Sequence, residues 1–316
     1  MTPKIHRSLA LGAAAALTAL TLAACGSDDS GDGGDTAPAA DAVPLTLATQ
    51  SFPEATLVGA LYEVLLEANG YDVEVKAVES RDAYFGELSS GDVDVVPEYL
   101  AAVGDFLNTQ ANGEGAEPVT SSDPAATEAA VVPLAQDAGV TLLDLSDASS
   151  QNAFFVTAET AESESLTALS DLEGQSIVLA ASPDCDGRAD CEGGLSDVYG
   201  IDITEILPLG FASPETYAAV QDGEAQLGLT GTIDPNLEDE GLVLLEDDRG
   251  IQPAQNYVPA VNSDFLAEHE DLAGPLDELM AALDNDTINE LLARITIDRE
   301  QATDVAEDYL TEQGLI

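Results

Sequence analysis

Cysteines are the residues whose spacing most directly suggests chemistry. Cys185 and Cys191 form a C-x5-C pair, and Cys25 stands near the start of the 316-residue chain. Disulfides persist in exported proteins, so we expect the pair to bond and to stabilise a small loop by roughly 2 kcal/mol. The alternative, a metal site, lacks partner ligands, because His269 is the one histidine beyond the first residues. We therefore expect no metal and no cofactor.

Residues 1–24 have the pattern of a lipoprotein signal peptide. Lys4 and Arg7 begin it, an Ala/Leu-rich run follows, and Leu22-Ala23-Ala24-Cys25 ends it as a lipidation site does. The run is shorter than the roughly 20 apolar residues of a membrane span, which disfavours a transmembrane anchor. A soluble secreted protein would leave Cys25 without a role. We expect Cys25 to carry the lipid that holds the protein at the extracytoplasmic face of the membrane.

The charge of the chain limits its partners. The sequence holds 61 Asp and Glu against 8 Lys and Arg, a net charge of −53. Loss of Lys4 and Arg7 with the signal takes the charge to −55. Such a surface repels phosphates, which excludes nucleic-acid binding. We interpret it as a solvated acidic coat. A weaker alternative is that it enriches cationic solutes near the protein.

Residues that could catalyse a reaction are few. The chain has no Gly-x-Ser-x-Gly elbow and no glycine-rich phosphate loop with a lysine. A nucleophilic triad needs a histidine, and His269 lies in an acidic stretch typical of a solvated surface. We expect that the protein is not an enzyme. An exported hydrolase or transferase is the alternative from another class.

Periodicity predicts the elements that position these residues. Residues 25–43 are rich in Gly, Ser, Asp, Ala and Pro and are expected to form a flexible tether. Beyond them, apolar patterns predict strands over 45–48, 73–78, 93–96, 140–143, 177–180, 226–229, 242–245 and 257–261. Residues 153–157 form a further apolar stretch. Helical spacing covers 54–69, 82–90, 123–137, 213–221 and most of the chain from 265. The early strand–helix alternation predicts a parallel α/β sheet, and its recurrence indicates a second α/β unit.

Several segments resemble the substrate-binding proteins of ABC importers for glycine betaine, choline, carnitine and related osmoprotectants. The most specific is 90–99, Ser-Gly-Asp-Val-Asp-Val-Val-Pro-Glu-Tyr, which is close to that family's Gly-x-x-Asp-x-x-Pro-Glu-Tyr stretch. Residues 50–54 resemble its opening loop, and 185–200 a cysteine-bracketed form of its arginine-containing loop. Later segments match in order: 217–223, 232–235, 252–259 and 314–316.

The resemblance implies a type II periplasmic-binding-protein-like fold, in which two α/β lobes are joined by two chain crossings. We place the crossings near Ser150 and Asn256. Lobe I would comprise residues 44–150 plus 257–316, and lobe II residues 151–256. A ligand would lie between the lobes, at the carboxyl ends of the strands. The implied partners are a small osmolyte and the permease subunits of the importer, with the protein a monomer.

The resemblance also implies a set of ligand-binding side chains, which we expect to be Phe52, Glu54, Tyr84, Tyr99, Arg188, Tyr217, Asp234 and Asn256. Tyr99 matches a cage tyrosine, and Arg188 would hold a ligand carboxylate. Arg81 lies near the same rim. Other roles remain open: a packed tyrosine, a surface ion pair for Arg188, a turn residue for Asp234 and a hinge residue for Asn256.

The expected ligand follows from the chemistry of such a site. A quaternary ammonium has no N–H to donate, so aromatic faces must select it, at roughly 0.5–2 kcal/mol each. A carboxylate on the same ligand is best held by an arginine fork. Gly231 stands where many members of the family have tyrosine, so one wall of the aromatic cage is expected to be missing. An amino acid or another small zwitterion is the alternative ligand.

Overall fold

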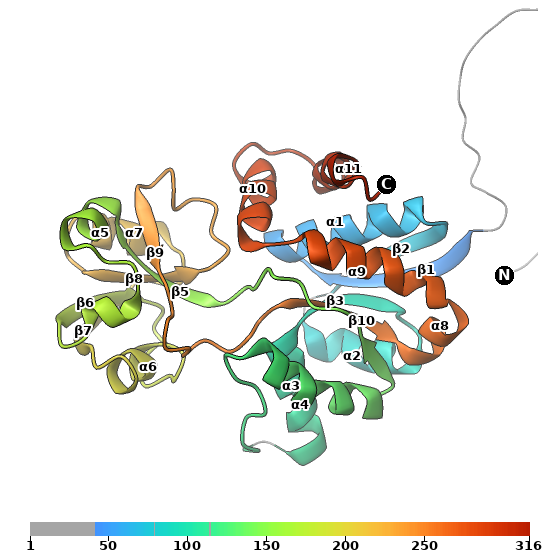
Figure 1. The fold of residues 1–316 in the computed structure, drawn as a ribbon, viewed down its shortest axis with the longest axis horizontal. Coiled ribbons are helices and arrows are strands. Elements are labelled where there is room, and N and C mark those ends of the chain that lie inside the picture. The colour runs from blue at the N-terminus through green and yellow to red at the C-terminus, as the bar shows by residue number, and fades with distance from the viewer. Residues whose placement is uncertain (1–41, 79, 114) are drawn as a thin grey trace, which may run out of the picture. The chain divides into compact units, whose positions relative to one another are not determined.

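The computed structural model describes residues 42–78, 80–113 and 115–316, which form two separate five-stranded sheets (Figure 1). Cys25 and the signal peptide lie outside the described residues. We call the residues around the first sheet lobe I and those around the second lobe II. Within the described part of the chain, no helix has the length and apolar character needed to span a membrane.

The sheet of lobe I has the strand order β2-β1-β3-β10-β4. Strands β1 (Val43–Gln50), β2 (Tyr71–Val78) and β3 (Val95–Tyr99) run parallel. Strand β10 (Tyr257–Asn262) pairs antiparallel with β3 and with β4 (Val140–Leu142). The predicted parallel β-α-β-α-β unit is present. The strand predicted over 93–96 begins and ends later, so Tyr99 is its last residue.

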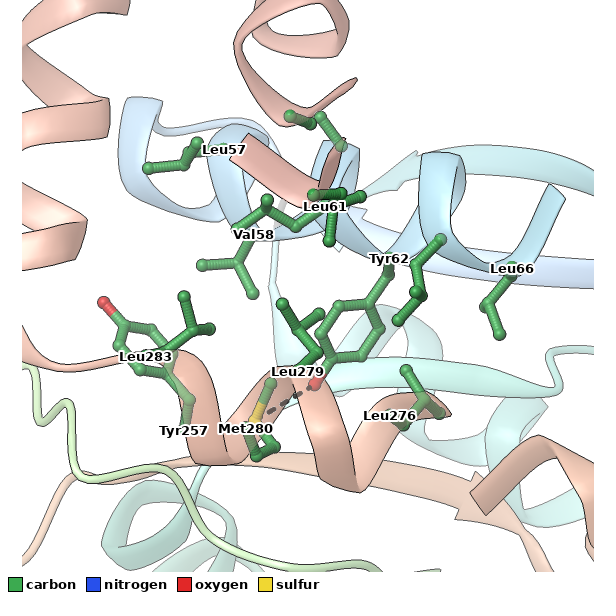
Figure 2. Packing of buried hydrophobic residues seen from close by; sticks show 14 of the residues in the cluster. Leu57, Val58, Leu61, Tyr62, Leu66, Tyr257, Leu276, Leu279, Met280 and Leu283 are labelled. Atoms are coloured by element: carbon green, nitrogen blue, oxygen red, sulfur yellow. Dashed lines mark hydrogen bonds between the residues drawn. The ribbon is translucent and has the colours of Figure 1, made fainter. Parts of the chain in front are cut away.

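Helices cover both faces of this sheet. On one face, α1 (Pro53–Ala68) packs with α9 (Ala273–Ala282), α10 (Asn285–Thr296) and α11 (Ala302–Gln313). Figure 2 shows leucines of α1 and α9 side by side, with the Tyr62 hydroxyl 3.8 Å from the Met280 sulfur. The other face carries α2 (Arg81–Ser90), α3 (Leu100–Asn112) and α4 (Pro124–Asp137). A short helix, α8 (Ser263–Glu268), follows β10.

The α3 helix was not predicted, because a glycine interrupts its apolar pattern. A Cβ at Gly104 would lie 2.3 Å from the Val131 side chain of α4, so glycine lets the two helices approach closely. The need for that glycine becomes visible only once the two helices are packed together.

The sheet of lobe II has the order β7-β6-β8-β5-β9. Strands β6 (Ser176–Ala181), β7 (Asp202–Pro208) and β8 (Leu227–Gly231) are parallel. Strand β5 (Asn152–Thr157) runs antiparallel to β8 and to β9 (Leu242–Leu245). The helices are α5 (Ala158–Glu164), α6 (Glu192–Asp197) and α7 (Pro214–Gln221). The sequence did not predict β7, an edge strand with polar residues among its apolar ones.

Two chain segments join the sheets, from β4 to β5 and from β9 to β10. They lie against each other, because Ser149 and Asn256 form an isolated antiparallel bridge. The Asn256 amide donates to the Ser146 carbonyl at 2.9 Å. Asn256 thus ties the two connecting segments together, as a hinge residue would.

Candidate ligand-binding site

The expected site residues of lobe I gather at the carboxyl edge of its sheet. Phe52 and Glu54 follow the end of β1 and begin α1, while Tyr99 ends β3. Tyr257, the first residue of β10, is paired directly with Tyr99 across the antiparallel ladder. The order of the strands therefore brings residues from three distant parts of the sequence to one edge.

Glu54 is the hub of this group. One carboxylate oxygen accepts hydrogen bonds from the Tyr99 and Tyr257 hydroxyls, both at 2.7 Å, and the other accepts from the Ser150 hydroxyl at 3.1 Å. The Tyr99 ring lies 5.3 Å from the Tyr257 ring and is stacked at 6.5 Å on Phe52, which is 40% exposed. We call Phe52, Glu54, Tyr99 and Tyr257 the lobe I aromatic cluster.

Both tyrosines of the cluster keep their protons at neutral pH. Burial raises the pKa of Tyr99 well above its usual value, and the neighbouring Glu54 charge and hydrogen bond raise it further. Burial and the charge of Glu54 also raise the pKa of Tyr257. Each hydroxyl is thus a fixed donor to the carboxylate. Both rings remain neutral; Tyr257 is buried, whereas Tyr99 is partly exposed.

A buried ion pair supports Tyr99 from behind. The Arg81 guanidinium donates to both oxygens of Glu98, at 2.8 and 2.7 Å, and Glu98 is 1% exposed. The Tyr84 hydroxyl also donates to Glu98, and the Tyr99 backbone N–H donates to it at 3.1 Å. Burial opposes the charge on Arg81, but the hydrogen bonds and charge of Glu98 outweigh it, so the pKa of Arg81 is raised. Tyr84, which was expected to bind the ligand, is buried, and its hydrogen bond to Glu98 makes it part of this group.

In lobe II, Arg188 lies in the cysteine-bracketed loop. Cys185 and Cys191 form the expected disulfide, and both are buried. The Arg188 guanidinium donates to the two oxygens of Asp190 at 2.9 and 2.5 Å and to Asp184 at 2.9 Å. A ligand carboxylate would therefore have to share or displace these aspartates. The role of Arg188 in binding a ligand stays a prediction.

Tyr217 and Asp234 lie together in lobe II. The Tyr217 hydroxyl donates to Asp234 at 2.6 Å, and the Thr230 hydroxyl donates to the same oxygen. Asp234 also accepts the Asn236 backbone N–H at 3.2 Å, which closes the turn after β8. Tyr217 is 6% exposed, and its ring packs against Phe155. Tyr217 and Asp234 thus stabilise the turn at the end of β8. That either residue contacts a ligand stays a prediction.

Two cavities are lined by residues of lobe II together with residues of lobe I or of the connecting segments. One of about 780 Å³ is lined by residues that include Gln151, Asn152, Thr232 and Gln252. Another, of about 990 Å³, is lined by Asp234 and by residues of β9 and α10. Tyr99 and Arg188 line neither of these two. No group of His, Cys, Asp and Glu suited to hold a metal ion occurs among the described residues.

Sequence reasoning missed Tyr257, Ser150 and Glu98. Tyr257 and Glu98 stand inside the segments that carry the family resemblance, so the sequence offered a signal for them. For Ser150, the only signal in the sequence was its position at the expected crossing between the lobes. Phe211, discussed below, had no signal in the sequence.

Comparison with known proteins identifies the family. Residues 43–312 match the substrate-binding domain of ABC-type glycine betaine transport systems. The chain belongs to this family. Its members are extracytoplasmic substrate-binding proteins of ABC importers and not enzymes. This confirms that the protein is not an enzyme and that it is extracytoplasmic, while the lipid anchor at Cys25 stays a prediction. The two-lobed α/β fold predicted from the sequence is likewise confirmed.

Individual relatives agree with this assignment. The glycine-betaine-binding protein of Pseudomonas aeruginosa is 27% identical over 291 residues, covering 88% of this chain and 90% of that protein. The structure of apo YehZ from Escherichia coli has a TM-score of 0.73 at 25% identity and covers 87% of this chain and 100% of that chain. A glycine betaine/carnitine/choline transporter structure, with a TM-score of 0.74 at 20% identity, covers 86% of this chain and 99% of its own and shares the fold.

Proposed function

We propose that this protein captures a quaternary-ammonium osmoprotectant, such as glycine betaine, carnitine or choline, between its two lobes. It then delivers the solute to the permease of its ABC importer while a lipid on Cys25 holds it at the membrane. A bound solute that contacts both lobes stabilises the closed arrangement of the lobes. The permease then binds this closed form.

The lobe I aromatic cluster is the observation that carries this proposal. The rings of Tyr99 and Phe52 are stacked at the carboxyl edge of the sheet, and Phe52 is 40% exposed. Trimethylammonium groups cannot donate hydrogen bonds and are selected by such faces. Hydrogen bonds from the tyrosine hydroxyls to Glu54 place a negative charge next to the rings, which favours a cation further.

Arg188 is the proposed partner of the ligand carboxylate. Its disulfide-bonded loop follows the carboxyl end of β6, the edge at which ligands bind in α/β sheets. Because Asp184 and Asp190 already hold the guanidinium, a ligand carboxylate gains less there than at a free arginine. Choline, which has no carboxylate, is therefore expected to depend on Arg188 less than glycine betaine does.

Calorimetric titration of the full chain with glycine betaine, carnitine, choline and proline tests the proposal. We expect Tyr99→Ala to weaken binding of all the quaternary ammonium ligands by about 2- to 30-fold, the range for one lost cation–π contact. Arg188→Ala should weaken glycine betaine and carnitine more than choline. Lys76→Ala, which removes a surface lysine paired with Glu87 in lobe I, is the control.

Two results would contradict the proposal. One is a wild-type protein that binds an amino acid but none of the quaternary ammonium ligands. The other is unchanged affinity in both the Tyr99→Ala and Arg188→Ala variants, each shown to be folded by its thermal transition.

A further inference from the structure

Phe211 is a large apolar side chain that the packing of lobe II leaves uncovered. It lies in the loop of residues 209–213, between β7 and α7, and is 50% exposed. Its ring reaches the end of β8, because a Cβ built on Gly231 would lie 3.3 Å from the Phe211 Cζ atom. The ring therefore occupies the space beside Gly231, the last residue of β8.

The Phe211 loop leaves the sheet at the same edge as the Arg188 loop. Strands β6, β7 and β8 are parallel, so the segments that follow their carboxyl ends lie at one edge. The backbone N–H groups of Leu209 and Gly210 donate to the Ala181 carbonyl at 2.9 and 3.0 Å, and Ala181 is the last residue of β6. Phe211, Arg188 and Gly231 thus lie at or just beyond one edge of the sheet, where the carboxyl ends of β6, β7 and β8 meet.

The loop holds Phe211 in place at the cost of backbone strain. Gly210 has a φ of +120°, and Ala212 has a φ of +46°, a conformation that residues with a side chain rarely adopt. Hydrogen bonds at 2.9 Å, from the Ser213 hydroxyl to the Leu209 carbonyl and from the Thr216 hydroxyl to the Gly210 carbonyl, fix the loop. Strain of this kind persists where the surrounding structure enforces it, and it concentrates at functional sites.

We propose that Phe211 is the lobe II aromatic wall of the ligand site, where its ring fills the space that a side chain at position 231 would otherwise take. This inference rests on the proposed function. The phenyl ring offers a face to a methylated ammonium and has no hydroxyl to accept a hydrogen bond from a primary ammonium. Phe211 accordingly selects for methylated over unmethylated cations. Gly231 is small because a side chain there would compete with the ring.

Paired substitutions at these two positions test the inference, with calorimetry on the full chain and choline and glycine betaine as probes. We expect Phe211→Ala to weaken both by about 2- to 30-fold. Phe211→Leu should lose nearly as much, although it keeps an apolar side chain. Adding Gly231→Tyr to Phe211→Ala should restore affinity. Gly231→Tyr alone should not increase it, because the two rings compete for one space.

A neutral probe separates cation–π attraction from apolar contact. 3,3-Dimethylbutan-1-ol has the shape of choline without its charge, so the ratio of choline affinity to that of this alcohol should fall in Phe211→Ala. Ile297→Ala is the control, since Ile297 is also exposed but lies near the C-terminal helices. Thermal transitions establish that each variant is folded.

The outcomes are distinguishable. If wild-type protein binds no quaternary ammonium compound, the proposed function fails and this inference fails with it. If the wild-type binds choline and Phe211→Ala binds it equally well, the inference alone is overturned. Phe211 would then be exposed for another purpose, such as contact with the permease. Loss of affinity in Phe211→Ala that Phe211→Leu fully reverses would also overturn it, because apolar contact would suffice.

Discussion

At the scale of single residues, the same chemical group has different roles in different surroundings. Glu54 accepts hydrogen bonds only from neutral hydroxyl groups, so its negative charge remains uncompensated beside the aromatic rings. Glu98 faces the Arg81 guanidinium, so its charge is neutralised and serves to fix Tyr99. In the proposed site, Glu54 would therefore attract the ligand cation, whereas Glu98 would hold Tyr99 in place.

Removal of Glu98 should therefore destabilise the protein. Glu98→Ala leaves Arg81 buried without its partner, and breaking a buried pair in this way costs about 3–5 kcal/mol in the free energy of unfolding. Glu87→Ala, which breaks the half-exposed pair with Lys76, should cost about 0–1 kcal/mol and is the matched control. Guanidinium unfolding curves measure both. Equal losses in the two variants would show that the Arg81–Glu98 pair has no special structural role.

At the scale of elements, the loops at strand ends are held by covalent or strained local structure. The Cys185–Cys191 disulfide closes the loop that carries Arg188, and the Ala212 conformation shapes the loop that carries Phe211. Neither loop is long enough to bury a core of its own. Their fixed shapes reduce the entropy that would otherwise be lost when a ligand orders them.

Loss of the disulfide should weaken both folding and binding. Replacing Cys185 and Cys191 together with alanine should lower the free energy of unfolding by about 2 kcal/mol, because the unfolded chain gains loop entropy. Affinity for glycine betaine should fall as well, since Arg188 would be presented by a looser loop. Denaturation and titration of the double variant test this. A variant that is less stable but binds glycine betaine unchanged would separate Arg188 from the ligand.

At the scale of elements, the sequence predicted the fold better than it predicted the contacts within the candidate site. Phe52, Glu54 and Tyr99 were found from motifs, because each lies in a short segment with a recognisable pattern. Tyr257 meets Glu54 across 203 positions of sequence, and that contact depends on β10 pairing with β3. The ring of Phe211 against Gly231 depends likewise on how the loop after β7 folds over β8. Local patterns carry no information on either pairing.

At the scale of the whole molecule, charge dominates. Removing Lys4 and Arg7 from the count leaves six basic residues, and five of these form ion pairs: Lys76, Arg81, Arg188, Arg249 and Arg294. Most acidic residues in the described part of the chain therefore have no basic partner there. Their mutual repulsion opposes the compact state.

Salt should consequently stabilise the protein. At neutral pH, raising NaCl from about 0.01 to 0.5 M shortens the Debye length from about 30 Å to below 8 Å and screens this repulsion. We expect Tm to rise by more than about 2–4 °C, the shift that 1 kcal/mol produces in domains of 150–250 residues. Calorimetry in NaCl and in KCl measures it, and sucrose controls for general solute effects. An unchanged or lower Tm in salt would contradict the role of repulsion.

The sequence by itself determined the fold class, the acidic composition, the disulfide pair and the lack of a recognisable catalytic motif. These follow from composition, from the order of apolar patterns and family-like segments along the chain, or from residues that are close in sequence. Only the tertiary structure decided that Glu54, Tyr99 and Tyr257 meet at one sheet edge, and that the Phe211 ring lies beside Gly231. Those meetings depend on strand order and register, which arise from packing between segments far apart in the chain.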